Sequence, residues 1–209
     1  MSDELCRATW AGDLNAVQAM VTAGADVNTP NRHGQGSLLT EHPHVIDYLL
    51  ANGADPNRQK NEFGASVLAG LCYLGAADGA RLLLAAGADV HSGREETRES
   101  PLHHALARCI PGDVDPERNR LIALLLTNGA DPNSQTLAGV CSANHYFLRT
   151  RGETPLHRAA AWASPGAIEL LLEAGANRNL ADANGELPVD WAGWHRRDRH
   201  IGEMLTPHR

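Results

Sequence analysis

The sequence predicts an all-α protein built as a single stack of helix pairs, and three observations lead to this prediction. A five-residue phrase that begins with glycine occurs five times along the 209-residue chain. An apolar run long enough for a short helix precedes every copy. Aromatic residues make up only 4% of the composition, so the core must consist mainly of Leu, Ala and Val, which suits thin stacked helices. Repetition of this kind is typical of solenoids, in which each unit packs only on its neighbours.

The recurring phrase marks the end of the second helix in each unit. Its copies read Gly-Ala-Asp or Gly-Ala-Asn and lie at 24–28, 53–57, 87–91, 129–133 and 175–179. The apolar runs before them predict helices over 17–21, 45–50, 80–84, 121–126 and 168–172. Glycine adopts the left-handed conformation at the least cost, so it ends a helix efficiently. The Asp and Asn residues that follow favour a tight turn.

The first helix of a unit is clearest in the fifth and fourth units. Residues 154–157 read Thr-Pro-Leu-His, and residues 100–103 read Ser-Pro-Leu-His. Thr154 is placed to cap a helix, and Pro155 takes the first helical position, where its missing N–H costs nothing. The alanines that follow His157 are small enough for the next unit to approach closely.

Together these phrases resemble the ankyrin repeat, in which a Thr-Pro-Leu-His inner helix and an outer helix are followed by Gly-Ala-Asp-Val-Asn at the start of a hairpin. The resemblance covers nearly the whole chain. It implies one domain, 1–209, of about six helix-pair units with atypical units at both ends. The expected units are 1–30, 31–60, 61–94, 95–135, 136–181 and 182–209. It also implies that His103 and His157 form hydrogen bonds between neighbouring repeats.

Successive glycines of the phrase are 29, 34, 42 and 46 residues apart, against about 33 in the family. In the second unit only residues 36–40 remain for the inner helix, which is about one turn too few. The fourth unit has extra residues at 109–117 between its two helices. The hairpin before the fifth unit carries an insertion at 136–148. We therefore expect a local defect in the stack at the second unit and two enlarged loops.

The resemblance implies that a partner binds on the concave face, where two consecutive positions near the end of each inner helix point outward. Because Trp, Tyr and Arg are the residue types enriched in interface hot spots, these positions are candidate contacts. An alternative interpretation is that the aromatic residues fill gaps between repeats. The candidate residues are Trp10, Tyr73, Leu74, Arg108, Trp162 and Trp194.

The insertion at 136–148 is a second candidate contact, because it is too apolar for an idle loop. Tyr146 and Phe147 would provide an aromatic anchor, with Arg149 and Arg151 beside it as a charged rim. In the alternative, Tyr146 and Phe147 fold back onto a neighbouring helix.

Other classes of function lack their signals. A net charge of −7 argues against nucleic-acid binding, and no apolar stretch approaches the roughly 18 residues of a membrane span. The four cysteines form no Cys-x-x-Cys pair, so we expect no metal site and no cofactor. Neither a nucleophile elbow, nor a His-Glu-x-x-His motif, nor a phosphate-binding loop occurs, so we expect no enzyme.

The cellular setting is inferred from composition. The chain starts without an apolar signal segment, and its scattered cysteines fit reduced thiols, so a cytoplasmic location is expected. Lys60 is the only lysine among 18 basic residues, which indicates a GC-rich, bacterial genome.

The predicted function is protein binding by a stand-alone module that is a monomer when free. It fits an inhibitor or immunity-type antagonist, and the acidic charge would suit a basic partner. Two alternatives remain: an effector delivered to a host cell, and a structural subunit of a permanent oligomer.

Overall fold

A computed structural model describes residues 1–61, 64–110, 115–142 and 149–207. Within these ranges the chain forms eleven α-helices and no β-strand. The helices are α1 (Ser2–Ala11), α2 (Leu14–Thr22), α3 (Pro43–Ala51), α4 (Val67–Leu74), α5 (Ala77–Ala85), α6 (Pro101–Ala105), α7 (Pro116–Thr127), α8 (Pro155–Trp162), α9 (Pro165–Glu173), α10 (Pro188–Trp194) and α11 (Arg199–Leu205). The all-α class predicted from the sequence is confirmed.

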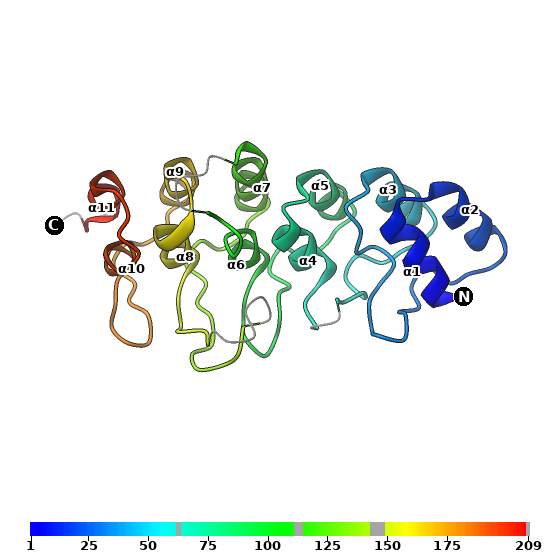
Figure 1. The fold of residues 1–209 in the computed structure, drawn as a ribbon, viewed down its shortest axis with the longest axis horizontal. Coiled ribbons are helices and arrows are strands. Elements are labelled where there is room, and N and C mark those ends of the chain that lie inside the picture. The colour runs from blue at the N-terminus through cyan, green and yellow to red at the C-terminus, as the bar shows by residue number, and fades with distance from the viewer. Residues whose placement is uncertain (62–63, 111–114, 143–148, 208–209) are drawn as a thin grey trace.

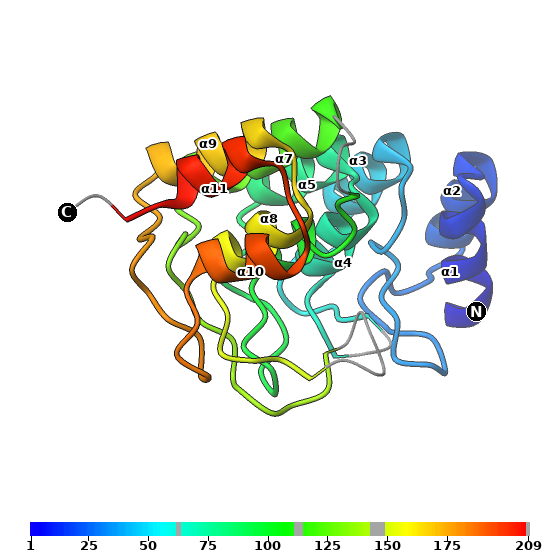
Figure 2. The same cartoon turned by 60° about the vertical axis from the view of Figure 1, so that its left-hand side comes forward.

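The helices lie in two rows along an elongated stack, with the chain termini at opposite ends (Figure 1). The inner row contains α1, α4, α6, α8 and α10, and the outer row contains α2, α3, α5, α7, α9 and α11. The loops that join successive units extend from the inner row, away from the outer helices (Figures 1 and 2). Each helix packs mainly on its partner in the same unit and on its counterparts in adjacent units.

The helix ends have the physical causes that the sequence indicated. The glycines of the recurring phrase follow the outer helices with positive φ, between 86° and 91°. At the other end, proline occupies the first turn of α3 and of α6 to α10. Asp or Ser side chains cap several helices, as when Asp115 accepts a hydrogen bond from the backbone N–H of Arg118 at 3.0 Å.

The two histidines of the inner-helix motif tie each repeat to the next, as expected. His103 Nε2 donates to the Glu153 carbonyl at 3.2 Å, and His157 Nε2 donates to the Glu186 carbonyl at 3.0 Å. The other ring nitrogen of each accepts a hydrogen bond from the backbone N–H of its own N-cap residue, Ser100 or Thr154. Each neutral imidazole therefore links a helix start to the following hairpin.

The second unit has no inner helix, so the array has five helix pairs and one unit with a single helix rather than six pairs. Leu38 and Leu39 fill the core in place of the helix and are 0% and 8% exposed. The backbone there is satisfied by the buried side chain of Gln59. Its Oε1 accepts from the N–H of Leu38 at 3.0 Å, and its Nε2 donates to the carbonyl of Val27 at 2.9 Å. The predicted defect is confirmed, and it is closed by a side-chain amide.

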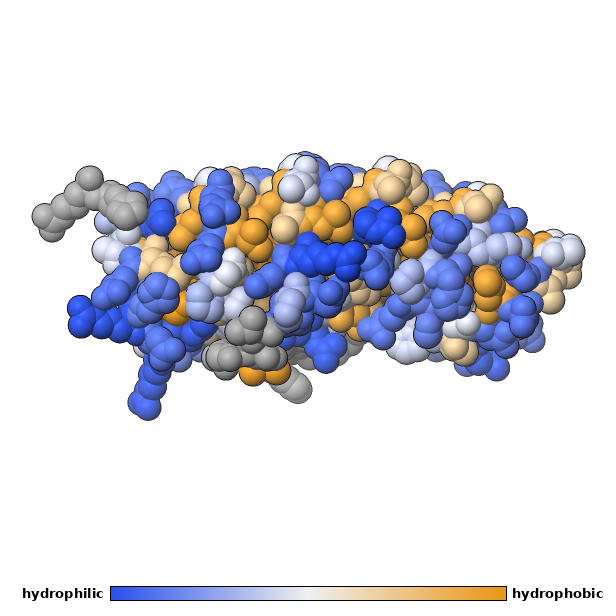
Figure 3. All heavy atoms as spheres, turned by 90° about the horizontal axis from the view of Figure 1, so that it is seen from above, coloured by the Kyte–Doolittle hydropathy of each residue, from blue (hydrophilic) through white to orange (hydrophobic). Residues whose placement is uncertain are grey.

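The core is one continuous apolar cluster that runs along the whole stack. On the outer side it reaches the surface through half-buried side chains one turn before the glycine of each unit: Leu50, Leu84, Leu126 and Leu172. Seen from this side, apolar surface forms a band between polar side chains (Figure 3). A stack that is only two helices thick leaves its inter-repeat leucines partly exposed.

Candidate protein-binding surface

The inner helices end in the residues predicted to contact a partner. Trp10, Tyr73, Leu74, Trp162 and Trp194 each lie within the last two residues of α1, α4, α8 or α10. We call this row, together with Arg108, the inner-helix surface.

Arg108 differs from the prediction in its local structure, because it follows α6 instead of ending it. Helix α6 stops at Ala105, three residues earlier. At this helix end, the buried guanidinium of Arg118 of α7 donates to the Ala105 carbonyl at 2.7 Å. Arg108 is nevertheless exposed, and it lies over the ring of Tyr73 at 5.3 Å from the centroid.

Three tryptophans of the inner-helix surface are exposed to solvent to an unusual degree. Trp10 is 62% exposed, Trp194 50% and Trp162 37%, whereas large apolar side chains usually lie inside a fold. Trp10 also has a structural contact, since its indole N–H donates to the Leu39 carbonyl in the second unit at 3.1 Å. Its ring therefore both holds the loop that replaces a helix and faces solvent.

Towards the C-terminus, aromatic rings and an arginine of this surface lie against one another. The ring of Trp162 lies 4.0 Å from that of His195, centroid to centroid. The guanidinium of Arg151 lies 5.2 Å from the ring of Trp194 and 5.9 Å from that of Trp191. Such contacts hold an arginine against apolar surface while its remaining donors stay available. Trp191 is also anchored by its indole N–H, which donates to Asp182 at 3.2 Å.

A hollow of about 630 Å³ lies between these rings and the base of the hairpin insertion. Its lining comes from the end of α6, from α8 and α10, and from residues on both sides of 143–148. The lining residues are Leu106, Ala107, Cys109, Ser142, Arg149, Thr150, Arg151, Glu153, Arg158, Trp162, Trp191 and His195. Tyr146 and Phe147, the other predicted contacts, lie outside the described residues.

A buried cluster of three charged side chains lies next to this hollow. Arg158 Nη2 lies 2.6 Å from a carboxylate oxygen of Glu99 and 2.6 Å from one of Glu153, and all three side chains are at most 10% exposed. The cluster also holds the insertion, because Ser142 donates to Glu99 and Thr136 donates to Glu153, each at 2.7 Å. Burial alone would raise the pKa of each carboxyl, but the Arg158 guanidinium and the hydrogen bonds to each carboxylate together outweigh it and lower the pKa of both Glu99 and Glu153 to about 2.

Sequence reasoning missed the cluster of Glu99, Glu153 and Arg158. It placed Arg151 in the charged rim beside Tyr146 and Phe147 but not against the rings of Trp191 and Trp194. Glu99 and Arg158 are 59 residues apart, and only the stacking of two repeats brings them together. Part of the cluster could have been found in the fifth unit. Glu153 directly precedes the Thr-Pro-Leu-His phrase and Arg158 directly follows it, so the start of one helix separates the two charges. No residue spacing, however, pointed to Glu99.

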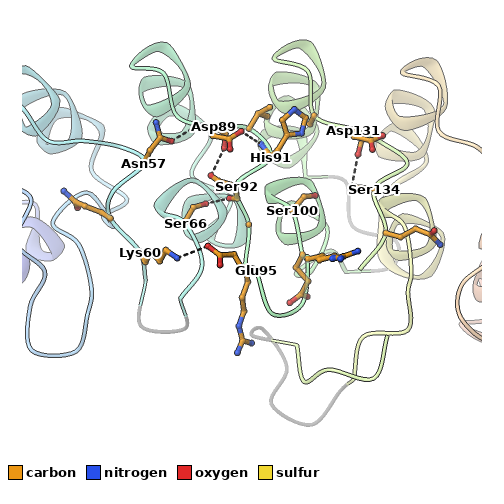
Figure 4. Close-up of a pocket in the computed structure, with 18 residues that line it drawn as sticks. Asn57, Lys60, Ser66, Asp89, His91, Ser92, Glu95, Ser100, Asp131 and Ser134 are labelled. Carbon is orange, nitrogen blue, oxygen red and sulfur yellow. Dashed lines mark hydrogen bonds and ion pairs between the residues drawn. The ribbon is translucent and has the colours of Figure 1, made fainter. Parts of the chain in front are cut away.

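A second hollow, of about 550 Å³, lies at the bases of the loops between units (Figure 4). In other turns an asparagine side chain bridges to the next repeat, as when Asn57 donates to the Gly87 carbonyl at 2.9 Å and accepts from the Asp89 N–H at 2.8 Å. His91 replaces this asparagine and Asp131 lies in the next turn, so the ladder is interrupted where the hollow opens. The polar side chains around it bond to one another, Lys60 with Glu95 among them. This hollow is thus a gap in the stacking, and several of the polar groups around it are already paired.

No group of three or more His, Cys, Asp or Glu side chains within the described residues is arranged to hold a metal ion. None of the helices described is both long and apolar enough to pass through a bilayer.

Comparison with known proteins decides the family. Residues 151–183 match the family model described as "Ankyrin repeat". Ankyrin repeat and SOCS box protein 16 of Homo sapiens is 30% identical over 214 residues, which cover 90% of this chain and 46% of the relative. The chain is an ankyrin-repeat protein. As an all-α repeat protein, it belongs to the protein-binding class.

Other relatives share only part of their length with this ankyrin array. Rabankyrin-5 of Mus musculus is 38% identical over 76 residues, which cover 36% of this chain and 6% of the relative. The chain therefore spans less than half the length of these curated relatives.

Among solved structures, the fold is similar to a chain of the complex titled "Bd0816 Predatory Endopeptidase from Bdellovibrio bacteriovorus in complex with immunity protein Bd3460". The TM-score is 0.70 at 23% identity, and the match covers 98% of this chain and 97% of that one. At this identity the likeness concerns the fold alone.

Proposed function

We propose that this ankyrin array binds a folded partner protein on its inner-helix surface and acts as an inhibitor or immunity-type antagonist of that partner. The observation that carries the proposal is the row of exposed tryptophans at the ends of inner helices, 37% to 62% exposed. Exposed apolar surface rimmed by charge marks interaction sites, and Trp, Tyr and Arg supply most hot spots.

The antagonist role is supported by precedent. A solved chain of similar fold comes from a complex of an endopeptidase with an immunity protein. We also propose a cytoplasmic location. All four cysteines are free thiols in the structure, and disulfides are rare in reducing compartments.

The test begins with affinity capture of the partner from lysate of the native cell. The double variant Trp162→Ala, Tyr73→Ala should weaken binding by about 2 kcal/mol or more, since truncation of a hot spot costs this much. The matched control is Arg81→Ala, Glu169→Ala, which removes two exposed side chains from the outer helices α5 and α9. Circular dichroism melts of both variants show whether either change unfolds the array.

Each result bears on a different part of the proposal. Loss of the partner from the folded double variant, but not from the control, supports the inner-helix surface. Retention of the partner by the folded double variant contradicts that surface. If the captured partner is an enzyme, one equivalent of the array should abolish its activity. Unchanged activity would contradict the antagonist role and leave protein binding intact. A concentration-independent dimer in light scattering, formed through the tryptophan row, would instead favour a structural subunit.

A further inference from the structure

We infer that the hollow beside Trp162 is the specificity pocket of the inner-helix surface, and that it takes an acidic loop of the partner in which a large apolar side chain stands between two Asp or Glu residues. This inference rests on the proposed function, because it names the chemistry of the segment that the surface would bind. The cavity of about 630 Å³ falls within the usual range of binding pockets, about 300–1,000 Å³.

The wall towards the inner helices is apolar. Leu106 and Ala107 line it after α6, and the rings of Trp162 and Trp191 line it from α8 and α10. Trp162 closes against His195, so these two rings form one continuous surface. Burial raises the pKa of the Cys109 thiol to about 11, with Arg118 opposing the effect, so this side chain stays a neutral thiol within the apolar wall. A large aliphatic or aromatic side chain would fill this part of the hollow.

The carboxylate that lines the hollow is already used. Glu153 is the carboxylate among the lining residues, and both its oxygens are engaged. One oxygen accepts from Arg158 Nε at 3.0 Å and from its Nη2 at 2.6 Å. The other accepts from the Thr136 hydroxyl at 2.7 Å and from the Arg151 N–H at 2.6 Å. A partner cation would therefore find this carboxylate occupied.

Donors, by contrast, remain available at the rim. Arg158 pairs with two ionised carboxylates, Glu99 and Glu153, so this buried cluster carries one net negative charge. Arg149 and Arg151 are the exposed cations of the lining. Arg149 donates through Nη1 to the Gly139 carbonyl. The side chain of Arg151 is 45% exposed, and its ion pair with Glu186 is long, at 3.8 Å. Guanidinium groups with spare N–H donors bind carboxylates through charge-assisted, often bidentate, hydrogen bonds.

The two arginines are held in place by the residue between them. Thr150 is 3% exposed, its N–H donates to the Val140 carbonyl at 2.8 Å, and its carbonyl accepts from the Gly139 N–H at 2.7 Å. This pairing fixes the backbone that carries Arg149 and Arg151 at the edge of the hollow. Because two cations line it, a loop with two acidic side chains matches the site better than a single chain-terminal carboxylate. Although the whole chain is acidic, the pocket therefore calls for a locally acidic partner segment.

The probe for the experiment is a display library of seven-residue loops closed by a disulfide, selected on the full chain. Selected loops are then synthesised with a fluorophore, and their dissociation constants are measured by anisotropy. We expect loops with Asp or Glu on both sides of a Leu, Phe or Trp. The variant Arg149→Gln, Arg151→Gln should raise Kd by about 10-fold or more, because it removes both guanidinium donors that would bind the carboxylates of the loop.

Controls separate the pocket from general charge effects. Arg120→Gln removes an arginine of α7, in the outer row of helices, where it pairs with Asp78 of α5 and Glu117 of α7. This change should alter Kd by less than about 2-fold. Trp162→Ala should weaken the selected loops as strongly as the double arginine change, and melts verify that each variant is folded.

Three outcomes overturn the inference: selection of basic loops, selection of apolar loops without acidic enrichment, or unchanged affinity in folded Arg149→Gln, Arg151→Gln. So does a dimer of the free chain that this variant dissociates, because a second copy would then fill the hollow. If the loop experiment contradicts the pocket but Trp162→Ala, Tyr73→Ala still loses the captured partner, the proposed function stands. If the selected loops bind through their acidic residues but Trp162→Ala, Tyr73→Ala retains the captured partner, the pocket inference stands and the proposed function is contradicted.

Discussion

The second and fifth units solve the same packing problem in different ways. In the second unit, the inner helix is replaced by Leu38 and Leu39 in an irregular segment, and one amide, Gln59, satisfies the backbone around them. The fifth unit keeps a full inner helix, α8, and places an arginine between two buried carboxylates beneath it. Both units keep the stack continuous, but only the fifth points a helix-end aromatic side chain, Trp162, into a hollow.

The difference shows what a helix adds in this solenoid. A neutral amide is enough to close the core, because it satisfies a few backbone groups without burying charge. A rigid helix and a charged cluster are needed where the hairpin insertion and the inner-helix surface must keep a fixed geometry. The buried cluster costs desolvation energy, and that cost is offset only while all three partners are present.

The largest expected effect comes from breaking the cluster of the fifth unit. Arg158→Met would leave Glu99 and Glu153 buried without their cation, which should lower the free energy of unfolding by about 3–5 kcal/mol. Urea denaturation measures this loss. The control Arg120→Met removes an arginine that is half exposed in its ion pairs, and it should cost less than about 1 kcal/mol. Equal losses in the two variants would contradict a special role for the cluster.

Acid should destabilise the fourth and fifth units before the second. Burial, with Arg158 adding to it, lowers the pKa of His103 to about 3, so the folded state holds this ring neutral. The unfolded chain takes up a proton below about pH 6.5, so stability falls as the pH drops from there towards 3. Between pH 6.5 and 5 the loss from His103 should be about 2 kcal/mol. Denaturation at a series of pH values measures it, and His103→Gln should flatten the curve in this window.

The carboxylates act at lower pH. Because Glu99 and Glu153 have a pKa of about 2 in the folded state, their contribution is complete above the ordinary pKa near 4.3 and is lost as pH falls towards 2. A stability curve of the parent chain that stays flat from pH 6.5 to 2 would contradict both assignments.

A smaller loss should follow from removing the amide of the second unit. Gln59→Ala leaves the buried N–H of Leu38 without its partner, while the carbonyl of Val27 keeps the hydrogen bond from the Ser37 hydroxyl, at a cost of about 1–2 kcal/mol. The comparison is Gln18→Ala, an exposed glutamine on α2, which should change stability by less than about 0.5 kcal/mol. A neutral Gln59→Ala would mean that Leu38 and Leu39 alone hold this unit.

The smallest effects concern single glycines. Gly175 has a φ of 91° and nothing within 4 Å of an added methyl group, so Gly175→Ala isolates the cost of the left-handed backbone, about 1 kcal/mol. Gly193 lies inside α10, also in open space, and Gly193→Ala should raise stability by about 0.5–1 kcal/mol. Thermal melts of the two variants should therefore shift in opposite directions.

Much of the fold follows from local signals. Glycine follows the outer helices α2, α3, α5, α7 and α9 because it enters the left-handed region cheaply, and proline begins helices where a missing N–H costs nothing. The repeats, a defect in the second unit and the bonds from His103 and His157 to the next repeat could all be predicted from such signals. The complete loss of the inner helix in the second unit goes beyond the predicted defect, since the sequence predicts about six helix pairs. The early end of α6 could not be predicted in this way; at this end Arg118 of the next helix donates to the Ala105 carbonyl.

The candidate site divides in the same way. The sequence by itself determined which residues end the inner helices, because that depends on register within a unit: Trp10, Tyr73, Trp162 and Trp194 lie where the repeat predicts. Only the tertiary structure decided that Trp162, Arg149 and Arg151 line one hollow, and that Glu99 joins Glu153 and Arg158 below it. Glu99 is 43 positions from Ser142 and 59 from Arg158, its two partners in the insertion and the fifth unit. These contacts form only when the repeats stack, because stacking excludes water from the buried charge. The next unit then supplies the partner that this charge needs.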